Sequence, residues 1–196
     1  MPEIFFLGMK HLDTNLSFEV RGKLKNFYRL IMSHGDFKQA HYIATRIDEN
    51  FHNGDDRRPL EALNCAMIIS YCRPFSGNDK KIQGKVPDLP ESFLKGLSKP
   101  EKELHHIVMT DRNTVLAHTD SSAFNLRPQV WIVGEKKFLL PLSNDTKAPL
   151  TRSLTEEFWL LTKKLRDKSF KQRMKLEQEL IGIFDVAPLG QILPEK

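Results

Sequence analysis

Residues 98–120, SKPEKELHHIVMTDRNTVLAHTD, constrain the fold of this chain more than any other stretch. Ser98 can cap the first turn of a helix, and Pro100 is tolerated within that turn because its missing N–H would be unpaired there anyway. Glu101 lies three residues after Ser98, as a capping box requires. The pattern therefore predicts a helix that begins at Ser98.

One face of this helix combines apolar residues with two ionisable ones. Five residues recur at steps of four, three, four and three, which places them on one stripe of a helix with about 3.6 residues per turn: Leu104, Val108, Asp111, Val115 and His118. Asp111 and His118 therefore interrupt a face expected to pack on a core, and buried ionisable groups need a partner or a function. His105 and His106 lie early in the helix and are expected on the surface.

The spacing late in this helix resembles a known motif. Arg112 and Asn113 are followed by four residues and then by His118. This order is similar to the Arg–polar–x(4)–His motif of the HEPN superfamily, whose helical members include metal-independent ribonucleases of toxin–antitoxin and phage-defence systems. The surrounding AHTDSSAF and the upstream SYCRPFSGND also resemble bacterial and phage-defence members. A structural ion pair at Arg112 and a core-satisfied His118 are the alternative interpretation of these residues.

The resemblance implies a catalytic role for three residues. His118 would transfer protons near neutral pH, Arg112 would hold phosphate oxygens and the charge of the transition state, and Asn113 would orient the histidine or the substrate. On a regular helix Arg112 and His118 would point about 120° apart and lie about 9 Å apart along the axis. A helix end at His118 or two copies meeting at a two-fold axis could bring them to one phosphate. The resemblance implies the second, an active cleft formed across a homodimer.

Further residues are predicted to bind substrate around this cleft. Asp111 shares the stripe with His118, and Asp120 could accept a hydrogen bond from the imidazole if the chain turns there. Tyr71 and Arg73 end an apolar helix that is expected to pack beside the motif helix. Arg73 could instead cap the carbonyl end of its own helix, which is the simpler interpretation.

The positive charge of the chain is concentrated near its end. The net charge is +5, and residues 161–175 hold seven basic residues and one acid. A basic helix attracts polyanions, so Lys163, Lys164 and Arg166 are predicted to contact RNA. A solvated helix face that aids solubility explains the same pattern equally well.

Composition excludes several classes of protein. The chain is 40% hydrophobic and 28% charged, as in soluble globular proteins. No run approaches the roughly 18 apolar residues of a membrane span, and we expect no signal peptide and a cytoplasmic location. Cys65 and Cys72 lie roughly 10 Å apart on one predicted helix, too far for a disulfide with each other. No zinc-binding pattern is present, so no metal or cofactor is predicted.

The chain as a whole predicts one mainly α domain, a HEPN-like helical bundle over residues 1–196. Two amphipathic helices are expected in the first quarter of the chain, separated by a break at His34-Gly35 and with Asp36 as the cap of the second. Residues 60–72 are apolar on nearly every side, which predicts the most buried helix of the bundle.

The second half predicts a hairpin and a long final helix. Residues 75–99 are expected to form a long connection that contains one turn. Residues 129–140 predict a small β-hairpin that covers the bundle, and residues 152–184 predict the C-terminal helix. Its apolar stripe is interrupted at Ser169 and Gln172, where a bend or an exit from the core is expected.

Two functions from different classes are compatible with these features. The first is a cytoplasmic, metal-independent endoribonuclease of a defence or toxin–antitoxin system, acting as a homodimer with a possible antitoxin or second effector protein as partner. The alternative is a non-catalytic HEPN-like binding or dimerisation module in which Arg112 and His118 are structural.

Overall fold

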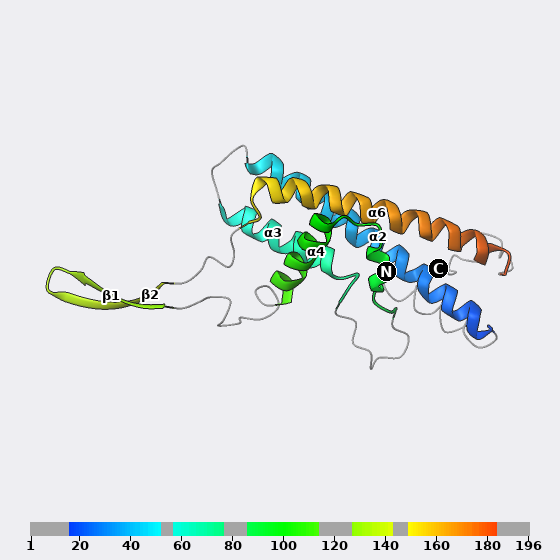
Figure 1. The fold of residues 1–196 in the computed structure, drawn as a ribbon, viewed down its shortest axis with the longest axis horizontal. Helices are drawn as coiled ribbons and strands as arrows, with labels where there is room; N and C mark the ends of the chain where they lie inside the picture. Colours follow the sequence, from blue (N-terminus) through cyan, green and yellow to red (C-terminus); the bar gives the residue numbers. More distant parts are fainter. Residues whose placement is uncertain (1–15, 52–56, 77–85, 114–126, 143–148, 184–196) are drawn as a thin grey trace, which may run out of the picture.

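The computed structural model describes residues 16–51, 57–76, 86–113, 127–142 and 149–183. In these ranges the chain is mainly helical, with a two-stranded antiparallel hairpin before a long C-terminal helix (Figure 1). This confirms the predicted mainly α fold with its hairpin insertion. The elements in order are α2 (Phe18–Phe51), α3 (Arg57–Cys72), the 3-10 helix η1 (Glu91–Leu94), α4 (Lys99–Asp111), β1 (Arg127–Val133), β2 (Lys136–Leu142) and α6 (Arg152–Ile181).

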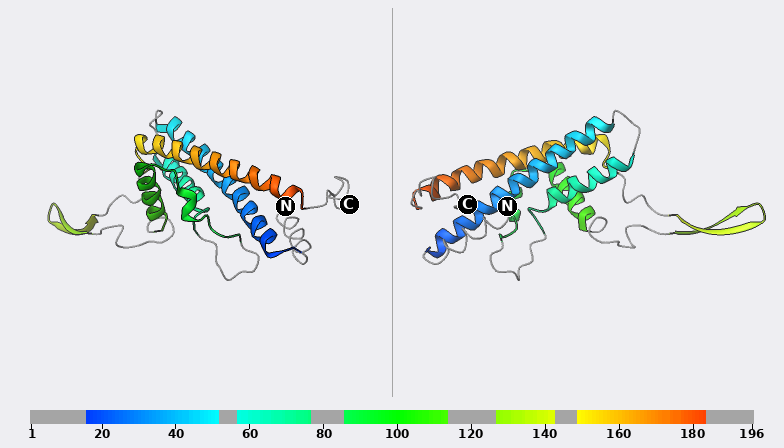
Figure 2. Two further views of the ribbon diagram at one scale, coloured as in Figure 1. Left: turned by 45° about the vertical axis from the view of Figure 1, so that its right-hand side comes forward. Right: turned by 180° about the vertical axis from the view of Figure 1, so that it is seen from behind.

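The two longest helices form the frame of the bundle. α2 and α6 run antiparallel and lie side by side in all the views (Figures 1 and 2). α3 packs on α2, and α4 contacts both α3 and α6. The interior is made of side chains from all four helices. Each large aliphatic side chain or phenylalanine that is fully buried stabilises the fold by about 1.5–3 kcal/mol. Its fully buried members include Phe37, Ala44, Ile47, Met67, Tyr71, Val108, Phe158, Leu161 and Leu165.

α2 continues without interruption through His34 and Gly35, so the predicted break between two helices is wrong. A glycine in a helix interior costs only about 1 kcal/mol. The buried residues Leu30 and Phe37, on either side of the glycine, offset that cost by packing in the core. Asp36, which was expected to cap a second helix, lies inside α2.

α3 has one exposed side, although its apolar sequence predicts burial on every side. Met67 and Ile68 are buried, but Ile69 is 37% exposed and Ala62 is exposed. The helix packs mainly on α2 and α4, and Tyr71 at its end also contacts Phe158 of α6 at 4.9 Å between ring centres. The two cysteines of the chain are free thiols.

The described part of the connection between α3 and α4 is held to the bundle by apolar side chains. Leu89, Phe93 and Leu97 are buried, and the backbone N–H of Leu89 donates to the carbonyl of Pro74 at 2.7 Å. The turn expected within this connection is present as η1.

Along the polar interruption of its stripe, α6 is buried at Ser169 and exposed at Gln172. Its first turn is capped by Thr151, whose hydroxyl accepts a hydrogen bond from the N–H of Leu154 at 3.4 Å. Ser169 is fully buried and donates to the carbonyl of Arg166 at 2.7 Å. The helix therefore leaves the core after Ser169 and not at it, since Gln172 is exposed. Within the described ranges, no helix has the length and apolar character that crossing a bilayer requires.

The hairpin is formed as predicted but does not cover the bundle. Trp131 pairs with Phe138 and Val133 with Lys136 across a tight turn, where Gly134 adopts φ +63°. A left-handed φ of this kind is readily adopted by glycine. Figure 1 shows both strands extended away from the helices, and Leu139 is 69% exposed. The expected role as a cover is therefore wrong.

Candidate functional site

The start of α4 is built as its sequence predicts. The hydroxyl of Ser98 accepts a hydrogen bond from the N–H of Glu101 at 3.4 Å, and the Glu101 carboxylate accepts from the N–H of Ser98 at 2.6 Å. The same carboxylate pairs with Lys164 of α6 at 2.8 Å. The capping box therefore sets the start of α4 and also ties this helix to α6.

The stripe along α4 is confirmed as far as the structure describes it. Leu104 and Val108 are buried in the core. Asp111 is half-buried, and desolvation raises the pKa of its carboxyl group. Val115 and His118 lie outside the described residues, as does Asp120.

Arg112 and Asn113 lie at the C-terminal end of α4. Arg112 is half-buried with helical backbone angles, φ −58° and ψ −44°, and Asn113 is exposed. Nη1 of Arg112 donates to the amide oxygen of Asn113 at 2.8 Å. Among the described residues Arg112 forms no ion pair with a carboxylate. Within the described residues the guanidinium uses one of its five donors in this way, and donors of this geometry suit the oxygens of a phosphate.

His105 is not the surface residue that its position early in α4 suggested. It is half-buried, and its Nδ1 lies 2.8 Å from the hydroxyl of Tyr71, with the ring of Phe75 edge-on at 4.8 Å. Burial, and secondarily the charge of His106, lowers the pKa of His105. The reason is tertiary: α3 brings Tyr71, and the turn after α3 brings Phe75, against this face of α4. His106 is exposed, as expected.

The prediction that Tyr71 touches substrate is corrected by its burial. Its side chain has no exposed surface and packs against the rings of Phe37, Phe75 and Phe158 at centroid distances of 6.0, 5.7 and 4.9 Å. Burial raises the pKa of Tyr71 well above its usual value, so its hydroxyl stays protonated and can donate to a neutral His105. Tyr71 can affect chemistry at the surface only through that histidine.

Arg73 also has a different partner from the one expected. Its Nη1 lies 3.5 Å from Asp36 of α2, so the side chain joins α3 to α2 instead of capping the carbonyl end of α3. Burial raises the pKa of Asp36 even though Arg73 and Arg29 act in the opposite direction. Arg73 remains 56% exposed, and its predicted contact with substrate stays a prediction.

The basic stretch of α6 is largely engaged within the molecule. Lys164 pairs with Glu101, and Arg166 pairs with Asp167 at 3.0 Å. The Lys163 ammonium lies 5.4 Å from the centre of the Trp159 ring. Exposed pairs of this kind contribute about 0–1 kcal/mol each. Of the three residues predicted to contact RNA, Lys163 is the one without a carboxylate partner in the described part of the chain.

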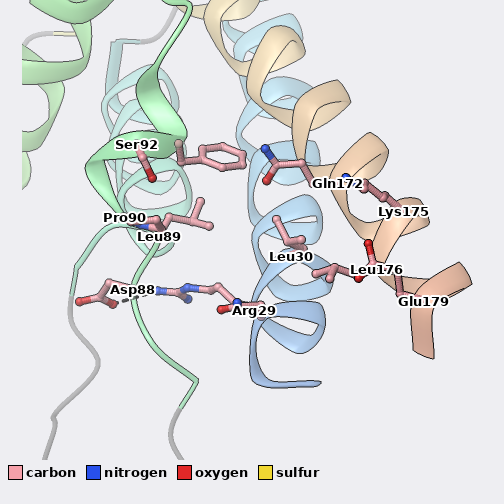
Figure 3. A pocket seen from close by; sticks show the side chains of 12 residues that line it. Arg29, Leu30, Asp88, Leu89, Pro90, Ser92, Gln172, Lys175, Leu176 and Glu179 are labelled. Atoms are coloured by element: carbon pink, nitrogen blue, oxygen red, sulfur yellow. Dashed lines mark hydrogen bonds and ion pairs between the residues drawn. The ribbon is translucent and has the colours of Figure 1, made fainter. Parts of the chain in front are cut away.

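A cavity of about 400 Å³ lies between α2, the segment around η1 and α6 (Figure 3). Arg29, only 3% exposed, donates through Nη2 to Asp88 at 2.9 Å and to the carbonyl of Pro74 at 2.7 Å. Burial lowers the pKa of Arg29, against the opposing charge of Asp88. These bonds fasten the connection between α3 and α4 to α2. None of the described residues that were predicted to act on RNA lines this cavity.

Arg29 carried no signal in the sequence that distinguished it from a surface arginine, because its partners lie 45 and 59 residues away.

No cluster of three or more His, Cys, Asp or Glu side chains suited to a metal ion occurs among the residues that the structure describes. Comparison with protein-family models, curated proteins and solved structures finds no match to this chain.

Proposed function

We propose that this chain is a metal-independent endoribonuclease of a defence or toxin–antitoxin system, with its cleft formed where two copies bring the ends of α4 together. One observation carries the proposal. Arg112 lies half-buried at the end of α4, is oriented by Asn113 at 2.8 Å and, among the described residues, has no carboxylate partner. An arginine held in this position is better suited to bind a phosphate oxygen than to form a structural ion pair.

The second catalytic residue of the proposed reaction, His118, is taken from the resemblance to HEPN ribonucleases. The 2′-hydroxyl of the substrate attacks the adjacent phosphorus, the bond to the 5′-oxygen breaks, and a 2′,3′-cyclic phosphate and a 5′-hydroxyl result. His118 transfers the proton, and Arg112 stabilises the added negative charge on the phosphate oxygens. Asn113 holds the guanidinium of Arg112 in position.

The test is cleavage of RNA by the purified protein in the presence of EDTA. We expect the wild-type protein to cut, and His118→Ala or Arg112→Ala to lower the rate by at least about 100-fold, as for loss of a proton-transfer or charge-stabilising group. His106→Ala and Arg46→Ala are matched controls, since both side chains are exposed and outside the motif. Intact RNA with an excess of wild-type protein would refute the proposal.

The second candidate is a non-catalytic binding or dimerisation module, and the exposed apolar hairpin favours it. In that case Arg112 and His118 would be structural. His118→Ala would then lower the free energy of unfolding by about 1–3 kcal/mol through unmade buried hydrogen bonds. Thermal unfolding of this variant beside the cleavage assay separates the two functions, and a pull-down of a protein partner would add support for the module.

A further inference from the structure

The η1 cavity, the space of about 400 Å³ that α2, the segment around η1 and α6 enclose, has walls that are fastened to one another. Arg29 of α2 donates to Asp88 at 2.9 Å. Nζ of Lys168 on α6 donates to the carbonyls of Phe93 and Lys95 at 2.6 and 2.8 Å. The segment around η1 is therefore fixed to both of the long helices that form the other walls, and the cavity is a built part of the fold.

The floor of the η1 cavity is apolar. Leu30, Leu89 and Phe93 line it and are only 5%, 8% and 3% exposed. Leu176 of α6 adds a half-buried side chain to the same lining. The volume falls within the range of about 300–1,000 Å³ that is typical of small-molecule sites, which combine apolar walls with a few placed polar groups. The floor therefore suits a ligand with an apolar surface.

The rim of the η1 cavity carries polar side chains from all three walls. They are exposed, and they are Asn26 of α2, Ser92 of η1, and Gln172 and Lys175 of α6. Within the described part of the chain, none of these side chains makes a hydrogen bond or an ion pair with another residue. Figure 3 shows the amide of Gln172 pointing from α6 towards the segment around η1. These groups are therefore available to a ligand.

The two amides favour a heterocyclic base as the ligand. A carboxamide presents a donor and an acceptor side by side, which is the pattern that pairs with the edge of a nucleobase. Asn26 and Gln172 bring this pattern to the cavity from two different helices. Proteins that bind unpaired bases hold them against apolar or aromatic side chains and read their hydrogen-bonding edges. A purely aliphatic ligand would leave both amides without partners.

The charges at the rim favour a phosphate beside that base. Both acids of the lining already have a basic partner, since Asp88 pairs with Arg29 at 2.9 Å and Glu179 pairs with Lys23 at 3.3 Å. Lys175 has no carboxylate partner among the described residues. A lysine ammonium binds phosphate as a point charge. Lys175 is therefore the charge of the rim that an anionic ligand would neutralise.

We propose that the η1 cavity binds one unpaired nucleotide, with its base against the apolar floor, the amides of Asn26 and Gln172 at the edge of the base, and Lys175 at the phosphate. The nucleotide is either free or part of a strand, because the recognised chemistry is the same. The inference deepens the proposed function and rests on it for RNA as the strand. It adds a site for substrate recognition that does not include Arg112.

The test is titration calorimetry of the full chain with two probes that the proposed reaction cannot cleave. They are the nucleoside 5′-monophosphates and single-stranded DNA, which lacks the 2′-hydroxyl. We expect Gln172→Trp, which fills the cavity, and Gln172→Ala, which removes the amide, to weaken binding by at least about tenfold. Gln178→Trp is the matched control, because this exposed residue of the same helix does not line the cavity. Circular dichroism checks that each variant is folded.

Two further comparisons define the ligand. Binding of the free monophosphates assigns the site to a nucleotide in solution, and binding of the DNA strand alone assigns it to a nucleotide within a strand. Lys175→Glu should weaken the binding of either probe. Ribose 5-phosphate, which lacks the base, should bind at least about tenfold more weakly than the nucleotide.

Three outcomes would overturn this inference. They are a wild-type protein that binds neither probe, a Gln172→Trp variant that binds as the wild type does, and ribose 5-phosphate that binds as tightly as the nucleotide. The last outcome would reduce the cavity to a site for anions. Binding with no cleavage of RNA would refute the ribonuclease alone, and cleavage of RNA with no binding at the cavity would refute this inference alone.

Discussion

The α2–α6 seam and the β1–β2 hairpin contain similar apolar residues in opposite environments. Phe158 and Leu161 in the seam have no exposed surface, whereas Phe138 and Val130 in the hairpin are 45% and 65% exposed. An amphipathic helix buries its one apolar stripe against a neighbouring helix. A hairpin that is apolar on both faces needs a cover on each side. The bundle buries the apolar stripes of its own helices and leaves the apolar side chains of the hairpin exposed.

The α2–α6 seam also shows how polar side chains that are enclosed between two helices find hydrogen-bond partners. Nδ1 of His34 lies 3.3 Å from the carbonyl of Arg166, and seven residues on, Nδ1 of His41 lies 3.2 Å from the carbonyl of Trp159. A carbonyl can only accept a hydrogen bond, so Nδ1 carries the proton in each histidine that makes this bond. The step of seven on both helices keeps the two contacts equivalent along the antiparallel pair.

The largest expected effect comes from truncating the same residue type in the two regions. Phe158→Ala should lower the free energy of unfolding by about 3–5 kcal/mol, because it leaves a cavity in the core. Phe138→Ala should change it by less than about 0.5 kcal/mol when the protein is dilute, as for a surface substitution. Urea denaturation of both variants measures the difference. Equal losses would show that the hairpin packs as tightly as the seam.

A smaller effect is expected from removing one buried hydroxyl of the seam. Thr162 is fully buried, donates to the carbonyl of Phe158 at 2.9 Å and lies 3.3 Å from Nδ1 of His41. Thr162→Val should therefore cost about 0.5–1.5 kcal/mol of stability. Ser153→Ala, at an exposed position of the same helix, is the control. A neutral result at Thr162 would mean that its bonds make no net contribution.

Alanine in place of glycine should have opposite effects in the two regions. At Gly35 an added Cβ would meet nothing within 4 Å, so Gly35→Ala should stabilise α2 by about 0.5–1 kcal/mol. At Gly134 the φ of +63° disfavours a side chain, so Gly134→Ala should weaken the hairpin turn by about 1 kcal/mol. Thermal unfolding reports the first change and cross-strand NMR contacts the second. A destabilising Gly35→Ala would argue for a break in α2.

The smallest effect is a pH dependence of stability from the buried histidines. Burial lowers the pKa of His41 and of His105 below the ordinary 6.5. As the pH falls, these histidines therefore bind protons in the unfolded chain before they do so in the folded protein. The free energy of unfolding falls as the pH drops from about 6.5 towards the lower pKa of the folded state. The raised pKa values of Asp36 and Asp111 act with the opposite sign at more acidic pH. Melting temperatures from pH 8 to 5.5 should fall less for His41→Gln than for the wild-type protein; identical slopes would exclude His41 as a contributor.

Local signals in the sequence predicted the capped start of α4 and the position of the hairpin, although they also predicted a break at Gly35 that is absent. Ser98 with Glu101, and Thr151, act on backbone groups within three residues. Gly134 produces its turn through its own φ. Interactions of this range need no knowledge of the rest of the fold, so a pattern of a few residues is sufficient to predict them.

The candidate site could be predicted only in part. The capped start and the stripe of α4 were predicted as far as Asp111, but Arg112 and Asn113 come directly after α4, where the pattern had placed them within a helix that continued to His118. The burial of Tyr71 and its contact with His105 could not be predicted, because the two residues are 34 positions apart on different helices. The ion pair of Lys164 with Glu101 likewise depends on the packing of α4 beside α6.

The sequence by itself determined that the chain forms helices with capped starts, one tight hairpin and a cluster of basic residues, because caps, turns and periodicity act over a few neighbouring residues. Only the tertiary structure decided that Gly35 lies within one long helix, that Ser169 is buried and that Trp131 is left exposed. Burial depends on partner surfaces far away in the chain, as for His34 and Arg166, which are 132 positions apart. A residue's own neighbours do not carry that information.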